Sequence, residues 1–146
     1  MAAFSRNVTV DWEGSLMDGK GAAKAGSGAF TLPVSFPRRI GDAEGVTSPE
    51  ELIAAAHAAC YAMALNGAIG RKGGAAAKTH ITATITADKG DAGIKIMSSK
   101  LVVVAEGLTG IAAADFPALA KEAEGKCPVS NALRGSLSIE VEASVK

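Results

Sequence analysis

The segment from Ser48 to Leu65 reads SPEELIAAAHAACYAMAL, and the fold is organised around it. Ser48 is a residue of the type that caps helix N-termini, and Pro49 suits the first helical position, where its missing N–H is not needed. Glu51 stands three residues after Ser48, which is the spacing of a capping box. The pattern predicts a helix from Ser48 to about Arg71, about 24 residues and about 36 Å long.

Small apolar residues occupy nearly every face of this predicted helix. Alanine occupies seven positions between residues 54 and 64, and leucine, isoleucine and methionine fill several others. A helix that is apolar all round is expected in an interior rather than on a surface. We therefore expect the helix to be the buried centre of the fold and to end at the Gly73-Gly74 pair.

Strand patterns lie on both sides of the helix. Apolar and polar residues alternate, or form short apolar runs, over residues 8–12, 20–25, 29–32, 79–88, 94–106 and 136–145. A second helix is predicted over 115–124, with a further helical turn over 130–133. Residues 33–47 are rich in proline and glycine and are expected to form a loop. This order predicts an α+β fold with largely antiparallel sheets, in one domain over residues 1–146.

The composition predicts a core that is thin for the length of the chain. Apolar residues make up 48% of the 146 residues, but alanine alone supplies 30 of them. Leu, Ile, Val and Phe together number only 32. A second copy of the chain would bury apolar surface that one copy cannot, so we expect a homodimer.

Charge and hydropathy exclude several classes of protein. Fifteen basic residues balance fifteen acidic ones without a basic stripe, so no nucleic-acid partner is expected. No segment approaches the roughly 18 uncharged apolar residues of a membrane span, and the first ten residues lack the apolar region of a secretory signal. We therefore expect no membrane insertion and a cytoplasmic location.

Two cysteines, Cys60 and Cys127, are the main candidates for chemistry. They form neither a CxxC motif nor zinc-finger spacing, and one interpretation is that both are buried structural thiols. In a cytoplasmic protein, however, a cysteine pair is more often catalytic, redox-active or metal-binding. Cys127 precedes Pro128 at a junction between segments, and a position near the first turn of a short helix favours a thiolate. The sequence permits a thiol–disulfide couple.

Charged residues near the helix start are further candidates. Glu50 precedes Cys60 by ten positions, which places them about 15 Å apart along a straight helix and about 80° apart around it. Glu50 therefore cannot reach Cys60 of its own chain, but it could serve a cysteine of a second, antiparallel copy. Arg38 and Arg39 are either a solvated basic pair or the source of a guanidinium that lowers a thiol pKa.

His57 and the glycine motifs carry weaker signals. His57 lies one helical turn before Cys60 and could join Cys60 and Cys127 in a zinc site, but a histidine satisfied by a backbone or carboxylate hydrogen bond is the favoured interpretation. The glycines do not form a nucleotide-binding fingerprint, and no serine nucleophile motif occurs. We expect neither a cofactor nor a metal.

The motifs around both cysteines resemble those of the OsmC/Ohr family, the osmotically inducible and organic hydroperoxide resistance proteins. The resemblance rests on residues 48–65, on Lys-Cys-Pro-Val-Ser over 126–130, on Trp-Glu-Gly over 12–14 and on Asp-Ala-Gly over 91–93. It covers essentially the whole chain. The histidine before Cys60 and the valine after Pro128 are more similar to the OsmC branch.

The resemblance implies an intertwined α+β homodimer, with antiparallel sheets around a long buried helix and two sites at the subunit interface. It implies a thiol-dependent peroxidase for organic hydroperoxides, and hydrogen peroxide as a further substrate, in which Cys60 is peroxidatic and Cys127 is resolving. Glu50 matches the family's active-site glutamate. Arg39, which has Arg38 beside it, matches the family's active-site arginine. A lipoyl- or thioredoxin-type dithiol is the expected reductant. The alternative is a non-catalytic redox-sensing or small-ligand-binding dimer.

Overall fold

The structure of the protein is a computed structural model that describes residues 2–146. The chain divides into two compact units, one up to Leu52 and one from Ile53 onward, and each is described by itself. The α+β class is confirmed, because sheets and helices occur in separate runs along the chain. The single domain expected over residues 1–146 stays a prediction.

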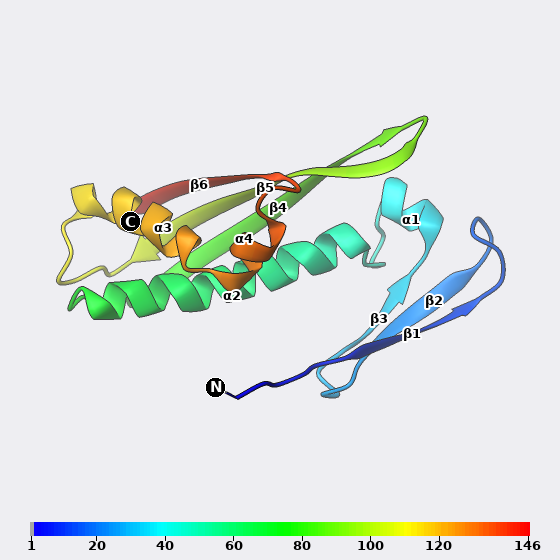
Figure 1. Ribbon diagram of the computed structural model, residues 1–146, viewed down its shortest axis with the longest axis horizontal. Coiled ribbons are helices and arrows are strands. Elements are labelled where there is room, and N and C mark those ends of the chain that lie inside the picture. Colours follow the sequence, from blue (N-terminus) through cyan, green and yellow to red (C-terminus); the bar gives the residue numbers. More distant parts are fainter. Residues whose placement is uncertain (1) are drawn as a thin grey trace. The chain divides into compact units, whose positions relative to one another are not determined.

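The first unit contains a three-stranded antiparallel sheet in the order β1-β2-β3 (Figure 1). The strands are β1 (Val8–Glu13), β2 (Lys20–Ala25) and β3 (Thr31–Val34). The first two agree with the sequence pattern, but β3 begins two residues later than expected and includes Pro33. Its proline is tolerated because β3 is an edge strand, where one side of the backbone needs no partner.

A short helix interrupts the loop expected over residues 33–47. Helix α1 (Phe36–Ile40) follows Ser35, whose extended backbone occupies the cap position, and Pro37 lies in its first turn. The prediction of a continuous loop is wrong here, because a proline in the first helical turn costs no hydrogen bond and so starts a helix as readily as it ends one. Arg38 and Arg39 therefore lie on α1 and not in a loop.

The start of the long helix α2 (Pro49–Arg71) is confirmed. The Ser48 hydroxyl accepts a hydrogen bond from the Glu51 backbone N–H at 3.1 Å, as a helix cap does. The Glu51 carboxylate accepts a hydrogen bond from the buried Thr47 hydroxyl at 2.6 Å. In a full capping box, this carboxylate would instead accept from the backbone N–H of the cap residue, Ser48. After the helix, Gly73 adopts a positive φ of 76°, which a glycine permits without strain.

The second unit contains a sheet in the order β4-β5-β6, with β4 (Lys78–Gly90), β5 (Gly93–Glu106) and β6 (Ser138–Val145). β4 and β5 form an antiparallel hairpin, but β5 and β6 are parallel. Three of the four strand pairings are antiparallel, which confirms the expectation of largely antiparallel sheets, and the β5–β6 pair is the exception. A 3-10 turn η1 (Ala113–Asp115), α3 (Phe116–Gly125) and α4 (Pro128–Leu133) connect β5 to β6, and such a crossover returns the chain to run parallel.

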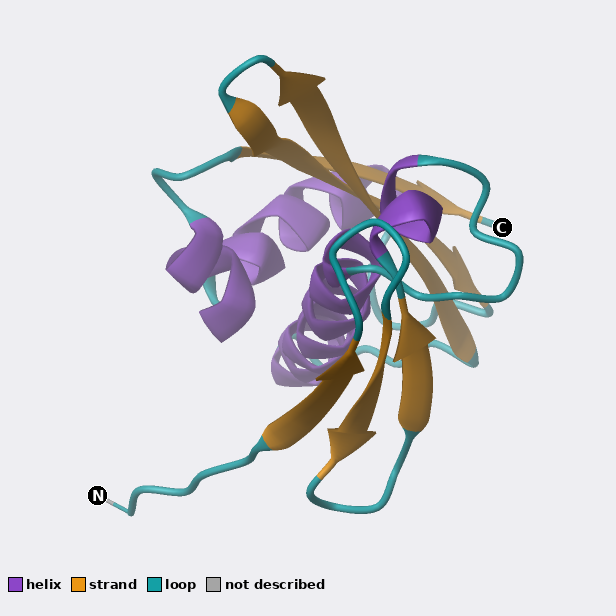
Figure 2. Ribbon diagram, turned by 90° about the vertical axis from the view of Figure 1, so that its right-hand side faces the viewer, coloured by secondary structure: helices purple, strands orange, loops and turns teal. Residues whose placement is uncertain are grey.

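Helices α2 and α3 pack against one face of the β4-β5-β6 sheet, as the end-on view of α2 in Figure 2 shows. The buried cluster contains Tyr61, Leu65, Ala68, Ile69, Leu101, Val103, Ala105, Phe116, Leu119, Ala120, Ala123 and Cys127. The buried Tyr61 hydroxyl donates to the Ala120 carbonyl at 2.9 Å and so joins α2 to α3. On the other sheet face, Lys100 pairs with Glu142 at 2.7 Å.

Within one chain, α2 is buried on one face only. Its buried residues are His57, Tyr61, Leu65, Ala68 and Ile69. Alanines on its other side are exposed, and Met63 is 76% exposed. The expectation of a helix buried all round is therefore not met by a single copy, because one sheet and one packing helix cover only one side of a cylinder.

Helix α2 is also long and apolar enough to cross a membrane by length and composition alone, with a mean hydropathy of 1.5 over its most apolar 18 residues. The expectation that no segment approaches the length and hydropathy of a membrane span is wrong. Many alanines together raise the mean hydropathy of the helix without any large side chain. The core helix of a soluble protein meets the same criterion. Its buried face packs against the β4-β5-β6 sheet, which is what a core helix does.

Candidate active site

The two thiols are neighbours in the second unit. Cys60 lies in the middle of α2 and packs, partly exposed, against the buried cluster that contains Cys127. Cys127 is fully buried at the residue before α4, where its Sγ accepts a hydrogen bond from the Ser130 backbone N–H at 3.5 Å. Both cysteines are free thiols. The Cys127 side chain lies within hydrogen-bond reach of Cys60.

Burial raises the pKa of the Cys60 thiol above its usual value and is the largest influence on it. A backbone hydrogen bond from Val129 lowers this pKa, whereas the adjacent Cys127 side chain raises it further. Because the raising influences prevail, Cys60 is mainly a thiol at neutral pH in this environment. A reactive thiolate at this position needs a cation near it.

His57 lies on the same side of α2 as Cys60 and is completely buried. Its Nδ1 is 2.6 Å from the Ser99 hydroxyl on β5, and its Nε2 is 2.7 Å from the Ser130 hydroxyl on α4. The histidine has hydrogen-bond partners, as expected, but these are serine hydroxyls, so the prediction of a backbone or carboxylate partner is wrong. Burial lowers the pKa of His57, so the ring is neutral, and Glu124 opposes this shift.

The structure gives no support to the alternative of a zinc site. Across residues 2–146, no group of three or more His, Cys, Asp or Glu side chains is arranged to hold a metal ion. Both ring nitrogens of His57 face serine hydroxyls at hydrogen-bond distance, so neither is free to join Cys60 and Cys127 in binding a metal.

In the first unit, Arg39 and Glu50 form a close ion pair. The Arg39 Nε donates to both carboxylate oxygens of Glu50 at 3.1 Å, and its Nη2 donates to Oε1 at 2.6 Å. The side chains are only 28% and 15% exposed. The Arg39 guanidinium lowers the pKa of Glu50, although burial opposes the shift, so the carboxylate stays charged and orients the guanidinium.

Arg38 takes a different partner and faces solvent. Its Nη2 lies 2.7 Å from Glu44, and its Nη1 donates to the Asp42 carbonyl at 3.2 Å. The two side chains of this ion pair are 40% and 62% exposed, so solvent screens the interaction. Of the two adjacent arginines, only Arg39 pairs with Glu50.

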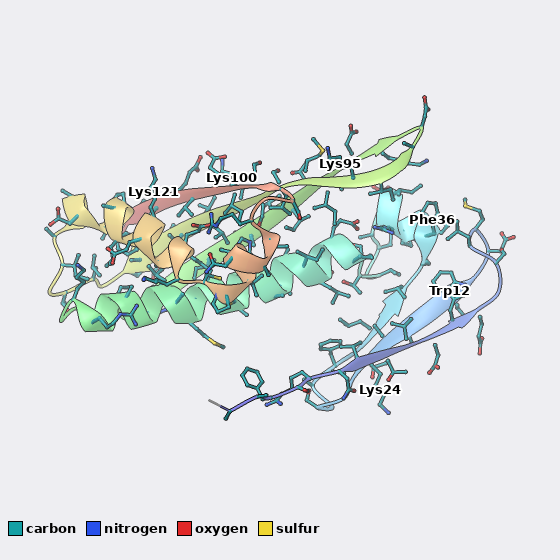
Figure 3. The ribbon with its side chains drawn as sticks, viewed as in Figure 1. Trp12, Lys24, Phe36, Lys95, Lys100 and Lys121 are labelled. Carbon is teal, nitrogen blue, oxygen red and sulfur yellow. The ribbon has the colours of Figure 1, made fainter. Side chains whose placement is uncertain are left out.

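Arg39 also lines an apolar cavity of about 320 Å³ within the first unit. Figure 3 labels two of its aromatic residues, Trp12 on β1 and Phe36 on α1. The remaining lining residues are mostly aliphatic: Val10, Leu16, Ala23, Val34, Pro49 and Leu52, with Ser35 and Thr47. The cavity therefore combines a guanidinium with an otherwise apolar surface, which suits a ligand that has one polar end.

Comparison with known proteins identifies the family. A family model described as OsmC-like protein matches residues 41–142. The chain belongs to this family. It is 37% identical to peroxiredoxin OsmC from Escherichia coli (strain K12) over 133 residues, which cover 90% of this chain and 91% of that protein. It is 35% identical to the organic hydroperoxide resistance protein OhrA from Bacillus subtilis, over 76% of this chain and 78% of that protein.

Solved structures of the OsmC/Ohr family share the fold. The chain matches a crystal structure of an organic hydroperoxide resistance protein from Elizabethkingia anophelis with a TM-score of 0.76 at 24% identity, over the whole of both chains. It matches one from Legionella pneumophila, described as an organic hydroperoxide resistance protein OsmC, with a TM-score of 0.73 at 25% identity, over 99% of this chain and 100% of that chain. The resemblance expected from the cysteine motifs is confirmed, and the relatives support a peroxide-related redox function.

Ser99 and Ser130, the partners of His57, were not predicted from the sequence. A signal for Ser99 is present: it shares the buried alternation of β5 with Leu101, Val103 and Ala105, so a polar residue there needs a buried partner. Ser130 lies within the second cysteine motif, but nothing in the sequence pairs it with a histidine 73 residues earlier. Only the packing of α4 beside α2 brings that pair together.

Proposed function

We propose that this OsmC-like protein is a cysteine-based peroxidase that reduces organic hydroperoxides in the cytoplasm. The observation that carries the proposal is the contact between two free thiols, Cys60 and Cys127, in a relative of peroxiredoxin OsmC. Cys60 is the more accessible of the two and is therefore the thiol that meets peroxide. Cys127 is buried beside it and waits for an oxidised partner.

The chemistry follows from the oxidation states of sulfur. The Cys60 thiolate attacks the terminal oxygen of the hydroperoxide, the O–O bond breaks, and the alcohol leaves after it gains a proton. Cys60 then carries a sulfenic acid. Cys127 attacks this sulfur and releases water, which leaves a Cys60–Cys127 disulfide. An external dithiol, of the lipoyl or thioredoxin type, reduces the disulfide by thiol exchange.

The Arg39–Glu50 pair supplies the cation that this scheme needs. Burial opposes ionisation of Cys60, and a guanidinium next to the sulfur would favour the thiolate. Glu50 holds the guanidinium in a fixed orientation through three hydrogen-bond contacts of 2.6 to 3.1 Å. The apolar cavity beside Arg39 would take the alkyl part of the hydroperoxide, with its polar end toward the guanidinium.

A second copy of the chain completes the proposed site. On one straight helix, Glu50 is about 15 Å along the axis from Cys60, which is too far for contact. In a homodimer, Arg39 and Glu50 of one subunit serve Cys60 of the other. Exposed apolar side chains at Trp12 and Met63 are surface that such a dimer would cover.

Light scattering at micromolar concentration is expected to give twice the mass of one chain. A second copy would cover the exposed alanine and methionine face of α2, which a single chain leaves in water. Met63→Lys places a charge on this face and is expected to favour the monomer, whereas Lys121→Glu, at an exposed position on α3, leaves the mass unchanged. A monomer mass for the unaltered protein would contradict the dimer.

Peroxide consumption in the presence of a dithiol tests the function directly. The purified protein is expected to turn over an alkyl hydroperoxide many times with a lipoyl- or thioredoxin-type dithiol, and to use hydrogen peroxide more slowly because it has no alkyl part to occupy the apolar cavity. A protein that forms its disulfide once and does not turn over with any dithiol would contradict the peroxidase and favour a redox sensor.

A further inference from the structure

We propose that His57, through Ser130, is a positioning residue for the second step of the reaction, the attack of Cys127 on oxidised Cys60. The inference rests on the proposed function for the meaning of that step. Its basis is a buried line of contacts that runs from β5 through α2 to α4 and ends at the Cys127 sulfur. None of the catalytic roles given to Cys60, Cys127, Arg39 and Glu50 uses this line.

Ser130 is held at two points, and both matter for Cys127. Its hydroxyl is 2.7 Å from His57 Nε2, and its backbone N–H donates to Cys127 Sγ at 3.5 Å. The first contact fixes α4 against α2, and the second fixes the sulfur at the start of α4. His57 is one helical turn before Cys60 on the same side of α2, so it joins α4 to the helix segment that carries the other thiol.

Ser99 fixes the histidine ring from the other side. Its hydroxyl lies 2.6 Å from His57 Nδ1, so three secondary-structure elements meet at one imidazole. His57, Ser99, Ser130 and Cys127 are each 0% exposed, and water cannot replace a lost partner. A neutral ring donates through one nitrogen and accepts through the other, and each serine hydroxyl can do either. Both ring nitrogens and both hydroxyls therefore have a partner.

The step that this line controls is a displacement at sulfur. The Cys127 sulfur attacks the sulfenic sulfur of Cys60, an S–S bond forms and the S–O bond breaks. The hydroxyl leaves as water with the proton of the Cys127 thiol. Such a reaction requires the two sulfurs to be aligned, and a displacement of about 1 Å costs up to about a hundredfold in rate. Attack of Cys60 on peroxide forms no bond to Cys127, so it does not require the two sulfurs to be aligned.

Ser130→Ala tests the proposal because it removes one hydroxyl and keeps the backbone N–H that faces Cys127. In single-turnover reactions with an alkyl hydroperoxide, we expect sulfenic acid to form on Cys60 within about twofold of the unaltered rate. Disulfide formation is expected to slow about tenfold or more, and sulfinic acid to accumulate. Ser99→Ala is expected to slow disulfide formation less, because the contact between His57 and Ser130 persists.

Ala68→Gly provides the matched control for general destabilisation. Ala68 is buried on α2 two turns beyond Cys60 and has no part in the line from Ser99 through His57 to Ser130, and glycine there weakens the helix. We expect this variant to unfold at a lower temperature and to keep the unaltered ratio of the two step rates. A Ser130→Ala protein that slows both steps equally, or neither, would overturn the positioning role.

A second arm replaces peroxide with an aromatic disulfide, 5,5′-dithiobis(2-nitrobenzoic acid). Cys60 displaces one thionitrobenzoate from the reagent, and Cys127 then displaces the other from Cys60, so absorbance reports the two steps separately. Ser130→Ala is expected to slow the second release and not the first. If the unaltered protein fails to react with any hydroperoxide, the proposed peroxidase function fails, while this arm still decides the role of His57 and Ser130.

Discussion

Replacing Cys60 with serine is expected to reduce peroxide consumption to the rate of peroxide and dithiol without protein. A serine hydroxyl is not ionised near neutral pH and has no accessible oxidation state like sulfenic acid, so both the attack and the intermediate are lost. Steady-state consumption of an alkyl hydroperoxide with excess dithiol measures this. Residual turnover well above the background would show that Cys60 is not the reacting thiol.

Cys127→Ser is the matched variant, because it keeps Cys60 and removes only the partner thiol. It is expected to complete about one turnover per subunit, after which Cys60 stays as sulfenic acid and proceeds to sulfinic acid. Mass spectrometry of the oxidised protein distinguishes these states. Normal turnover of Cys127→Ser with a dithiol would contradict the resolving role, while the result for Cys60→Ser would still identify the first thiol.

Arg39→Ala is expected to lower peroxide reactivity at neutral pH by about 10- to 1,000-fold. A cation within a few ångströms lowers the pKa of an acid by about 1–3 units, and each unit changes the thiolate fraction about tenfold when the thiol predominates. Removing the guanidinium leaves Cys60 with the raised pKa that burial imposes. The rate of Cys60 alkylation and of peroxide consumption, each measured across pH, reports the loss.

The way in which the activity deficit of Arg39→Ala changes with pH distinguishes an electrostatic role of the guanidinium from a loss of structure. If the guanidinium acts by favouring ionisation, raising the pH restores the thiolate and the deficit of Arg39→Ala shrinks. Arg38→Ala is the control, because its pair with Glu44 is exposed and screened, and it is expected to stay within about twofold of the unaltered protein. Equal losses for both variants, or a deficit of Arg39→Ala that persists at high pH, would contradict the electrostatic role.

The elements of the fold were predictable where local rules decide them. The N-terminus of α2 follows from Ser48, Pro49 and Glu51, and the structure has the Ser48 cap at 3.1 Å. Strands β4 and β6 follow from strict alternation. The short helix α1 and the parallel pairing of β6 were not predictable in this way, because one depends on a proline that also fits a loop and the other on a crossover through three helical segments.

The candidate site was predictable in part. Cys60, Cys127, Arg39 and Glu50 were predicted from residue type and from the resemblance of their motifs to the OsmC/Ohr family, and their catalytic roles stay predictions. The sequence left Arg38 and Arg39 nearly equivalent, because adjacent residues share the same local composition. The structure distinguishes them through their partners, since only Arg39 meets a poorly exposed carboxylate.

Sequence by itself determined what is local: the capped helix, the alternating strands, the two cysteine motifs and, through them, the family. Tertiary structure alone decided which side chains meet across long stretches of chain. His57 finds Ser99 on β5 and Ser130 on α4, 42 and 73 residues away, and Cys127 lies beside Cys60. The physical reason is that hydrogen-bond partners and thiol neighbours are selected by how helices and strands pack, and packing depends on the whole set of buried surfaces at once.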